Sequence, residues 1–188
     1  MREIRAYIAA LLIAAITVSA SGCAASARAA DLMDGILPNA VAGNPTDQAF
    51  IANMAEFSVE LFKRSITYGE NSLISPLSVM LALAMTANGA NGETLAQMEA
   101  LLGGGITLDE LNEYLYTYVK GLPNYDQAKL HIANSIWFRD HEKVLRVEPD
   151  FLQRNADYFG AAAYRAAFDA KTVEDVNEYA SIGRSCSP

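Results

Sequence analysis

The sequence predicts a mixed α/β domain, in which several helices pack on a few strands. Three patterns indicate this fold class. Apolar residues recur at helical spacing over residues 50–66, a helix at 76–87 is apolar on almost every side, and residues 130–138 alternate in the manner of a strand. We expect the domain to occupy residues 46–179, with a divergent tail at 180–188.

The first 22 residues are predicted to be an export signal. Their apolar run, at residues 6–18, is too short to span a bilayer but suits the core of a signal peptide. Small residues come directly before Cys23, as in bacterial lipoprotein signals, so we predict that the Cys23 sulfur carries lipid. An ordinary secretory signal, cut near Ala24 or after Ala30, is the alternative. The protein is thus expected outside the cytoplasm, either anchored to a membrane by lipid or extracellular.

Residues 23–45 follow the signal and are predicted to be a tether between membrane and domain. They are rich in alanine, glycine, proline and asparagine and show no firm periodicity.

The charge and the cysteines exclude several classes of protein. A net charge of −8, spread along the chain, argues against a nucleic-acid binder, which needs basic patches to neutralise phosphates. Cys23 and Cys186 lie near opposite ends of the chain and make no disulfide framework. Neither cysteine has the spacing of a metal site, so we expect no metal and no cofactor.

The first half of the domain is expected to begin with two helices. Residues 45–46 carry the start signals of a helix that Gly69 ends, and residues 71–74 are a candidate strand. Ser75 is expected to cap the apolar helix, with Pro76 in its first turn. Because this helix is apolar nearly all round, it must be buried on every side.

The remaining elements follow from capping residues and glycines. A third helix is expected at 93–102, and a capping box at Thr107 opens a fourth. After the strand at 130–138 we expect a helix at 149–160, a strand at 161–168, and a last helix capped by Thr172.

Four blocks of the sequence, in order, resemble the N-terminal part of the serpin family. They are FSVELFKRS at 57–65, NSLISPLSVMLALAMTANGANGETLAQMEALLG at 71–103, ANSIWFR at 133–139 and FDAKTVEDVNEY at 168–179. The second block is long and specific. The resemblance implies a serpin fold, one α/β domain with a large mixed central sheet surrounded by helices.

The resemblance also implies a function and a set of site residues. Serpins inhibit serine or cysteine proteases by offering a reactive loop that, once cleaved, inserts as a new strand in the central sheet. Ser75, Ser78 and Asn134 match small polar positions of the shutter, where that sheet parts to admit the loop. A helix cap, a first-turn serine and a satisfied buried amide are their respective structural alternatives.

After Asn177 the sequence departs from the serpin pattern, and no counterpart of the reactive loop is present. We therefore expect an inhibitor truncated before its reactive loop and inactive as it stands, with a frameshift as the hypothesis for the tail. A non-inhibitory serpin-like surface lipoprotein or a gene remnant is the alternative. Without the missing strands, the apolar helix and the strand at 130–138 lack cover, so residues 24–188 are expected to be poorly soluble or molten.

An enzyme is disfavoured. The sequence contains no G-x-S-x-G motif. Its two histidines, His131 and His141, fit surface positions better than a catalytic triad, which is recognised by geometry.

Overall fold

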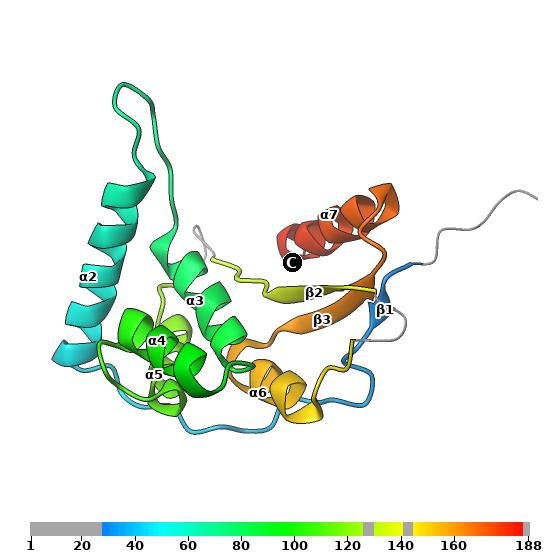
Figure 1. The fold of residues 1–188 in the computed structure, drawn as a ribbon, viewed down its shortest axis with the longest axis horizontal. Coiled ribbons are helices and arrows are strands. Elements are labelled where there is room, and N and C mark those ends of the chain that lie inside the picture. Colours follow the sequence, from blue (N-terminus) through cyan, green and yellow to red (C-terminus); the bar gives the residue numbers. More distant parts are fainter. Residues whose placement is uncertain (1–27, 126–129, 141–144, 186–188) are drawn as a thin grey trace, which may run out of the picture.

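The computed structural model describes residues 28–125, 130–140 and 145–185, in which a group of helices stands beside a small sheet (Figure 1). In that view α6 lies below the sheet and α7 above it. The mixed α/β class expected from the sequence is confirmed. The elements are β1 (Ala30–Asp31), α2 (Gln48–Ser65), α3 (Pro76–Ala87), α4 (Gly92–Gly103), α5 (Leu108–Lys120), β2 (Ser135–Arg139), α6 (Pro149–Phe159), β3 (Ala162–Ala166) and α7 (Ala170–Ser185).

The sheet has the strand order β1-β3-β2. Strands β2 and β3 are parallel, with Ser135 opposite Ala162 and Arg139 opposite Ala166, and α6 connects them as a crossover. Strand β1 pairs antiparallel with the other edge of β3. Within the described residues, β2 is therefore an edge strand, as expected for the strand that we predicted to keep an open edge.

Helix α3 lies at the centre of the hydrophobic core and contacts α2, α4, α5 and α6. Three of its residues, Ser78, Ala82 and Thr86, are nevertheless exposed and follow one another at helical spacing. The helix is therefore not buried on every side in this chain. The buried core consists of Phe50, Met80, Leu81, Ala84, Met85, Ala87, Leu102, Leu108, Leu111, Leu115, Phe159 and Ala161.

Two of the three predicted helix caps are confirmed. Ser75 caps α3, and Thr107 forms the expected capping box with Glu110 at the start of α5. Thr172 does not cap α7, which begins two residues earlier and continues through the divergent tail to Ser185. The Thr172 amide instead donates to the carboxylate of Asp169 at 3.0 Å, so the turn that starts this helix is built on Asp169.

Each predicted strand differs from the observed backbone. Residues 71–74 form no strand, and Leu73 is almost fully exposed, because the segment has no neighbouring strand in the described part of the chain. The strand predicted at 130–138 is the shorter β2, and the one predicted at 161–168 is the shorter β3. Both end where the parallel pairing of the two strands ends.

The segment that we predicted to be a tether contacts the domain along most of its described length. We call residues 29–43 the N-terminal strap. At its start, Ala30 and Asp31 pair with β3, and the Leu32 amide donates to the carbonyl of Ala163 at 2.9 Å. Because the strap extends the sheet, it belongs to the fold.

Farther along, the strap is held by α5 and α6. The Asn39 amide donates to Asp157 at 2.7 Å, and the Gln153 side chain donates to the Leu37 carbonyl at 2.9 Å. At Gly43 a Cβ atom would lie 2.1 Å from the Thr117 hydroxyl, so a larger residue would require the Thr117 side chain on α5 to move.

The pKa of Asp157 reflects its attachment to the strap. Burial by itself would raise this pKa, but hydrogen bonds from the Asn39 amide and from the Gln153 and Asn39 side chains hold it below its ordinary value of 3.8. The carboxylate therefore stabilises the attached strap above pH 3.8, and this contribution is lost as the pH falls through the lowered pKa.

No helix among the described residues is both long enough and apolar enough to span a bilayer. The predicted signal at 1–22, Cys23, His141 and Cys186 lie outside the residues that the structure describes.

Candidate functional site at the open face of helix α3

The site expected from the sequence lies where α3 begins and where β2 has its free edge. The exposed side of α3 starts with Ser75 and continues through Ser78 to Thr86. Figure 1 shows α7 lying over the sheet, apart from α3. Among the described residues, the helix face with hydroxyl groups is exposed and the outer edge of β2 has no neighbouring strand.

Ser75 and Ser78 contact each other directly. Their Oγ atoms are 2.8 Å apart, and the Ser78 amide also donates to Ser75 Oγ at 3.4 Å. Both residues are exposed. This is the geometry of a helix N-cap. Ser75 therefore caps α3, and this role is compatible with a further role of the serine pair.

Asn134 lies just before β2 and ties three elements together. Its side-chain amide donates to the carbonyl of Phe159 at 2.9 Å. Its own carbonyl accepts from the Ala162 amide at 2.9 Å and from the Tyr179 hydroxyl at 2.7 Å. Among the described residues, no hydrogen bond joins Asn134 to Ser75 or Ser78, so the structure brings the two serines together but holds the asparagine separately.

A hydrogen-bonded set of three asparagines, of which two are buried and one is half-buried, was not found by sequence reasoning. Asn112 on α5 donates to the Asn88 side chain at 2.8 Å, and Asn88 donates to the Asn155 side chain on α6 at 3.4 Å. Asn112 is completely buried, and its Oδ1 has no hydrogen-bond partner in the part of the chain that the structure describes. For Asn112 and Asn155 the available signal was a polar residue inside the apolar stripe of a helix, between Leu111 and Leu115 in α5 for example.

Under α7, aromatic side chains cover one face of the sheet. The rings of Trp137 and Tyr164 stack at 4.6 Å, and Tyr164 meets Tyr179 edge-on at 5.8 Å. Burial raises the pKa of Tyr179, and burial together with the nearby Asp31 carboxylate raises that of Tyr164. These contacts fix α7 on the sheet and leave β2 free only at its edge.

The described residues contain no group of three histidine, cysteine, aspartate or glutamate side chains able to hold a metal ion. His131 is exposed, and no hydrogen bond in the described part of the chain links it to Ser75 or Ser78. The arrangement can exchange hydrogen bonds at a strand edge, but it does not assemble a nucleophile with a base.

Comparison with known families decides the assignment. The family described as "Serpin (serine protease inhibitor)" matches residues 52–182. The chain belongs to the serpin family. Its relatives include Serpin-Z2B of Oryza sativa subsp. japonica, 32% identical over 120 residues, and neuroserpin of Homo sapiens, 32% identical over 123 residues. These matches cover 60% and 61% of this chain, but only 28% of each relative.

Among solved structures, the chain is similar to the thermophilic serpin tengpin in its native state. The two are 55% identical with a TM-score of 0.77, over 84% of this chain and 40% of tengpin. The serpin fold expected from the sequence is therefore confirmed for an N-terminal part. The residues described here span less than half of the serpins that they match.

Proposed function

We propose that this chain is the N-terminal part of a serpin that inhibits serine or cysteine proteases by inserting a reactive loop into its central sheet. The observation that supports this most strongly is the similarity to native tengpin, at 55% identity over 84% of the chain. Serpins as a family are inhibitors of proteases, so this chain is expected to have a protease as partner and no catalytic activity of its own.

In this proposal Ser75, Ser78 and Asn134 belong to the shutter. The serine pair lies exposed at the start of α3 and can exchange its mutual hydrogen bond for one with an arriving strand. Asn134 anchors the beginning of β2 against α6 and α7 through the Phe159 carbonyl and the Tyr179 hydroxyl, so the strand edge beside it stays in place.

The 188 residues by themselves are expected not to inhibit. They span 40% of tengpin, and their family match ends at residue 182, whereas the reactive loop of a serpin lies near its C-terminus. The decisive step is to sequence the coding DNA through codon 177 and several hundred bases beyond it. A restored reading frame that encodes the remaining serpin strands would support the hypothesis of an inhibitor. DNA without serpin-like sequence in any frame would support the alternative hypothesis of a gene remnant.

The completed chain would then be incubated with serine and cysteine proteases and tested for complexes that survive SDS. We expect such complexes from the completed chain and none from residues 1–188. Ser78→Leu should lower the complexed fraction, because the larger side chain obstructs the opening, whereas Thr94→Leu, exposed on α4, should not. If proteases cleave the completed chain without forming any complex, the protein is a non-inhibitory serpin-like lipoprotein and the proposed inhibition is wrong.

We further propose that the protein is exported and held at a membrane by lipid on Cys23. The lipoprotein-like signal before Cys23 supports this proposal. Intact mass of the membrane fraction tests it, with Cys23→Ala as the control that cannot be lipidated.

A further inference from the structure

The chain between the proposed lipid and the folded domain is short. The first described residues already contact α7, since the Arg28 guanidinium lies 4.0 Å from the Glu178 carboxylate and the Ala29 amide donates to Asp175 at 3.0 Å. The Arg28 pair is exposed and contributes little. The amide hydrogen bond, together with the β1 pairing that follows it, fixes the backbone from Ala29 onward.

Residues after Ala29 do not lengthen the free linker between Cys23 and the domain, because the N-terminal strap is attached to β3, then to α6, then to α5. Its anchor points are the β1 pairing, the Asn39 contact with Asp157 and the close approach of Gly43 to Thr117. A segment held at its start, middle and end cannot act as a flexible linker.

The reach of the anchor follows from covalent geometry. Cys23 lies five residues before Arg28, so the chain between them extends about 18 Å at most. A free linker from Cys23 to Pro45 would instead extend about 75 Å. Acyl chains on Cys23 would hold its sulfur in the membrane interface, so Arg28 cannot lie farther from that interface than the shorter distance.

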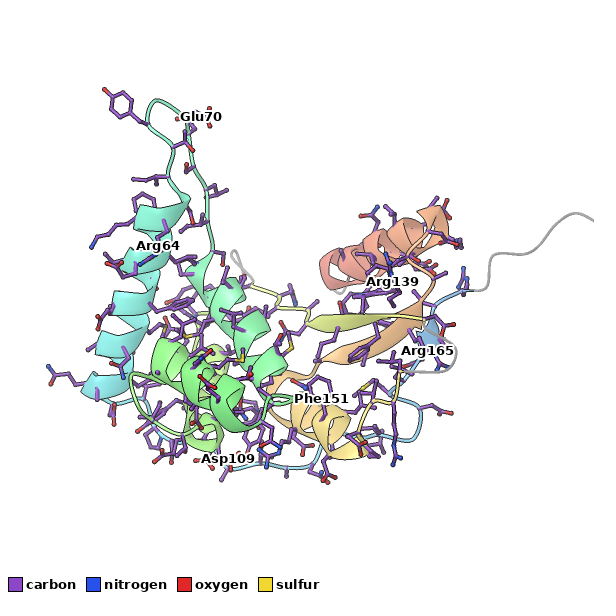
Figure 2. The ribbon with its side chains drawn as sticks, in the orientation of Figure 1. Arg64, Glu70, Asp109, Arg139, Phe151 and Arg165 are labelled. Atoms are coloured by element: carbon purple, nitrogen blue, oxygen red, sulfur yellow. The ribbon has the colours of Figure 1, made fainter. Side chains whose placement is uncertain are left out.

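We propose that the lipoprotein is held closely against the membrane by what we call the β1 end, namely Arg28, β1 and the C-terminal ends of β2 and β3. This inference rests on the lipidation of Cys23 proposed above. Figure 2 shows Arg139 and Arg165 at the β1 end and Glu70 at the opposite end of the molecule. The connection between α2 and α3, with the fully exposed Tyr68, therefore points away from the lipid.

The anchor sets this orientation, and surface charge does not. The chain carries a net charge of −8, and Arg165 at the β1 end is paired with Asp140 at 3.7 Å. Salt would screen an electrostatic attraction to anionic lipid, whereas it does not change the length of a covalent anchor. Raising the salt concentration should leave the orientation unchanged.

The chain has a natural probe for a test. Its single tryptophan, Trp137, lines a cavity of about 190 Å³ together with Arg28 and Ala29, and so reports from the β1 end. The lipidated chain ending at residue 188 would be reconstituted in vesicles of phosphatidylethanolamine and phosphatidylglycerol with dansyl-labelled headgroups. Energy transfer from Trp137 to dansyl is compared with transfer in Trp137→Phe/Tyr68→Trp, which moves the donor to the opposite end.

We expect higher transfer from Trp137 than from the tryptophan at position 68, with no change in high salt. Inserting a ~20-residue Gly/Ser linker, of r.m.s. length about 25 Å, between Ala25 and Ser26 should reduce the transfer from Trp137. Equal transfer from both positions, or no effect of the linker, would overturn the inference while leaving lipidation intact. If the wild-type chain shows an intact mass without lipid, as the Cys23→Ala control must, the lipidation of Cys23 is wrong and the inference falls with it.

Discussion

Phe50 and Phe62 lie on the same helix, α2, in very different surroundings. Phe50 is 2% exposed, and its ring stacks on Tyr114 at 4.9 Å and meets Tyr118 edge-on at 6.0 Å. Phe62 is 47% exposed on the uncovered side of the helix. The same substitution, phenylalanine to alanine, changes the helix propensity equally at both positions. The comparison therefore separates the effect of burial from that of helix propensity.

The expected losses of unfolding free energy differ severalfold. Truncating a fully buried phenylalanine costs about 3–5 kcal/mol, including the cavity and the lost ring contacts. For Phe62 roughly half of the side-chain transfer free energy is at stake, about 1 kcal/mol. With a urea m-value of about 2 kcal/mol/M, Phe50→Ala should lower the transition midpoint by about 2 M and Phe62→Ala by about 0.5 M.

The assay is urea unfolding of the completed chain, in which the remaining serpin strands are expected to cover the apolar area that residues 28–188 leave exposed, followed by the fluorescence of Trp137 and by far-UV circular dichroism. Trp137 reports on the sheet and the dichroism on the helices, so coincident transitions confirm that both parts unfold together. Equal midpoint shifts for the two variants would refute the reasoning, because they would mean that Phe50 is no better buried than Phe62.

Three further predictions concern the surface, the strap and a cap. Because α2 and α3 leave apolar area uncovered, residues 24–188 should self-associate in light scattering and Phe62→Glu should reduce this; a sharp two-state melt from a wild-type monomer would contradict the prediction. Asp157→Ala should expose the Asn39 amide to hydrogen exchange and cost about 1 kcal/mol, and the wild type should show the same faster exchange only below pH 3.8. Thr107→Ala removes a capping box and should cost about 1 kcal/mol by thermal melting, whereas Thr94→Ala, which caps nothing, should leave the melting temperature unchanged.

The sequence predicted the helices well because their signals are local. Ser75 with Pro76, and the capping box at Thr107, act on the first turn of their own helix, so nothing distant is needed to read them. The start signals at 45–46 did not identify the cap of α2, which is Asp47, whose side chain accepts from the Phe50 amide at 2.8 Å. Neighbouring cap-type residues differ only in backbone angles, which the sequence does not display.

The serpin assignment was also readable from the sequence, since it depended on the order of four blocks of residues. The strands were read less well, because a strand exists only where another strand pairs with it. Residues 71–74 have the composition of a strand but no neighbour among the described residues, and β2 and β3 extend only as far as each pairs with the other.

By itself, the sequence determined the fold family and the caps of α3 and α5. Only the tertiary structure decided that residues 29–43 are a strap, that α7 continues through the tail, and that Asn88, Asn112 and Asn155 form one hydrogen-bonded set. The strap and the asparagine set depend on groups far apart in the chain: the backbone of β3, the carboxylate of Asp157, and side chains from α5, α6 and the end of α3. Such partners come into contact only when the chain folds, so no local sequence pattern predicts these contacts.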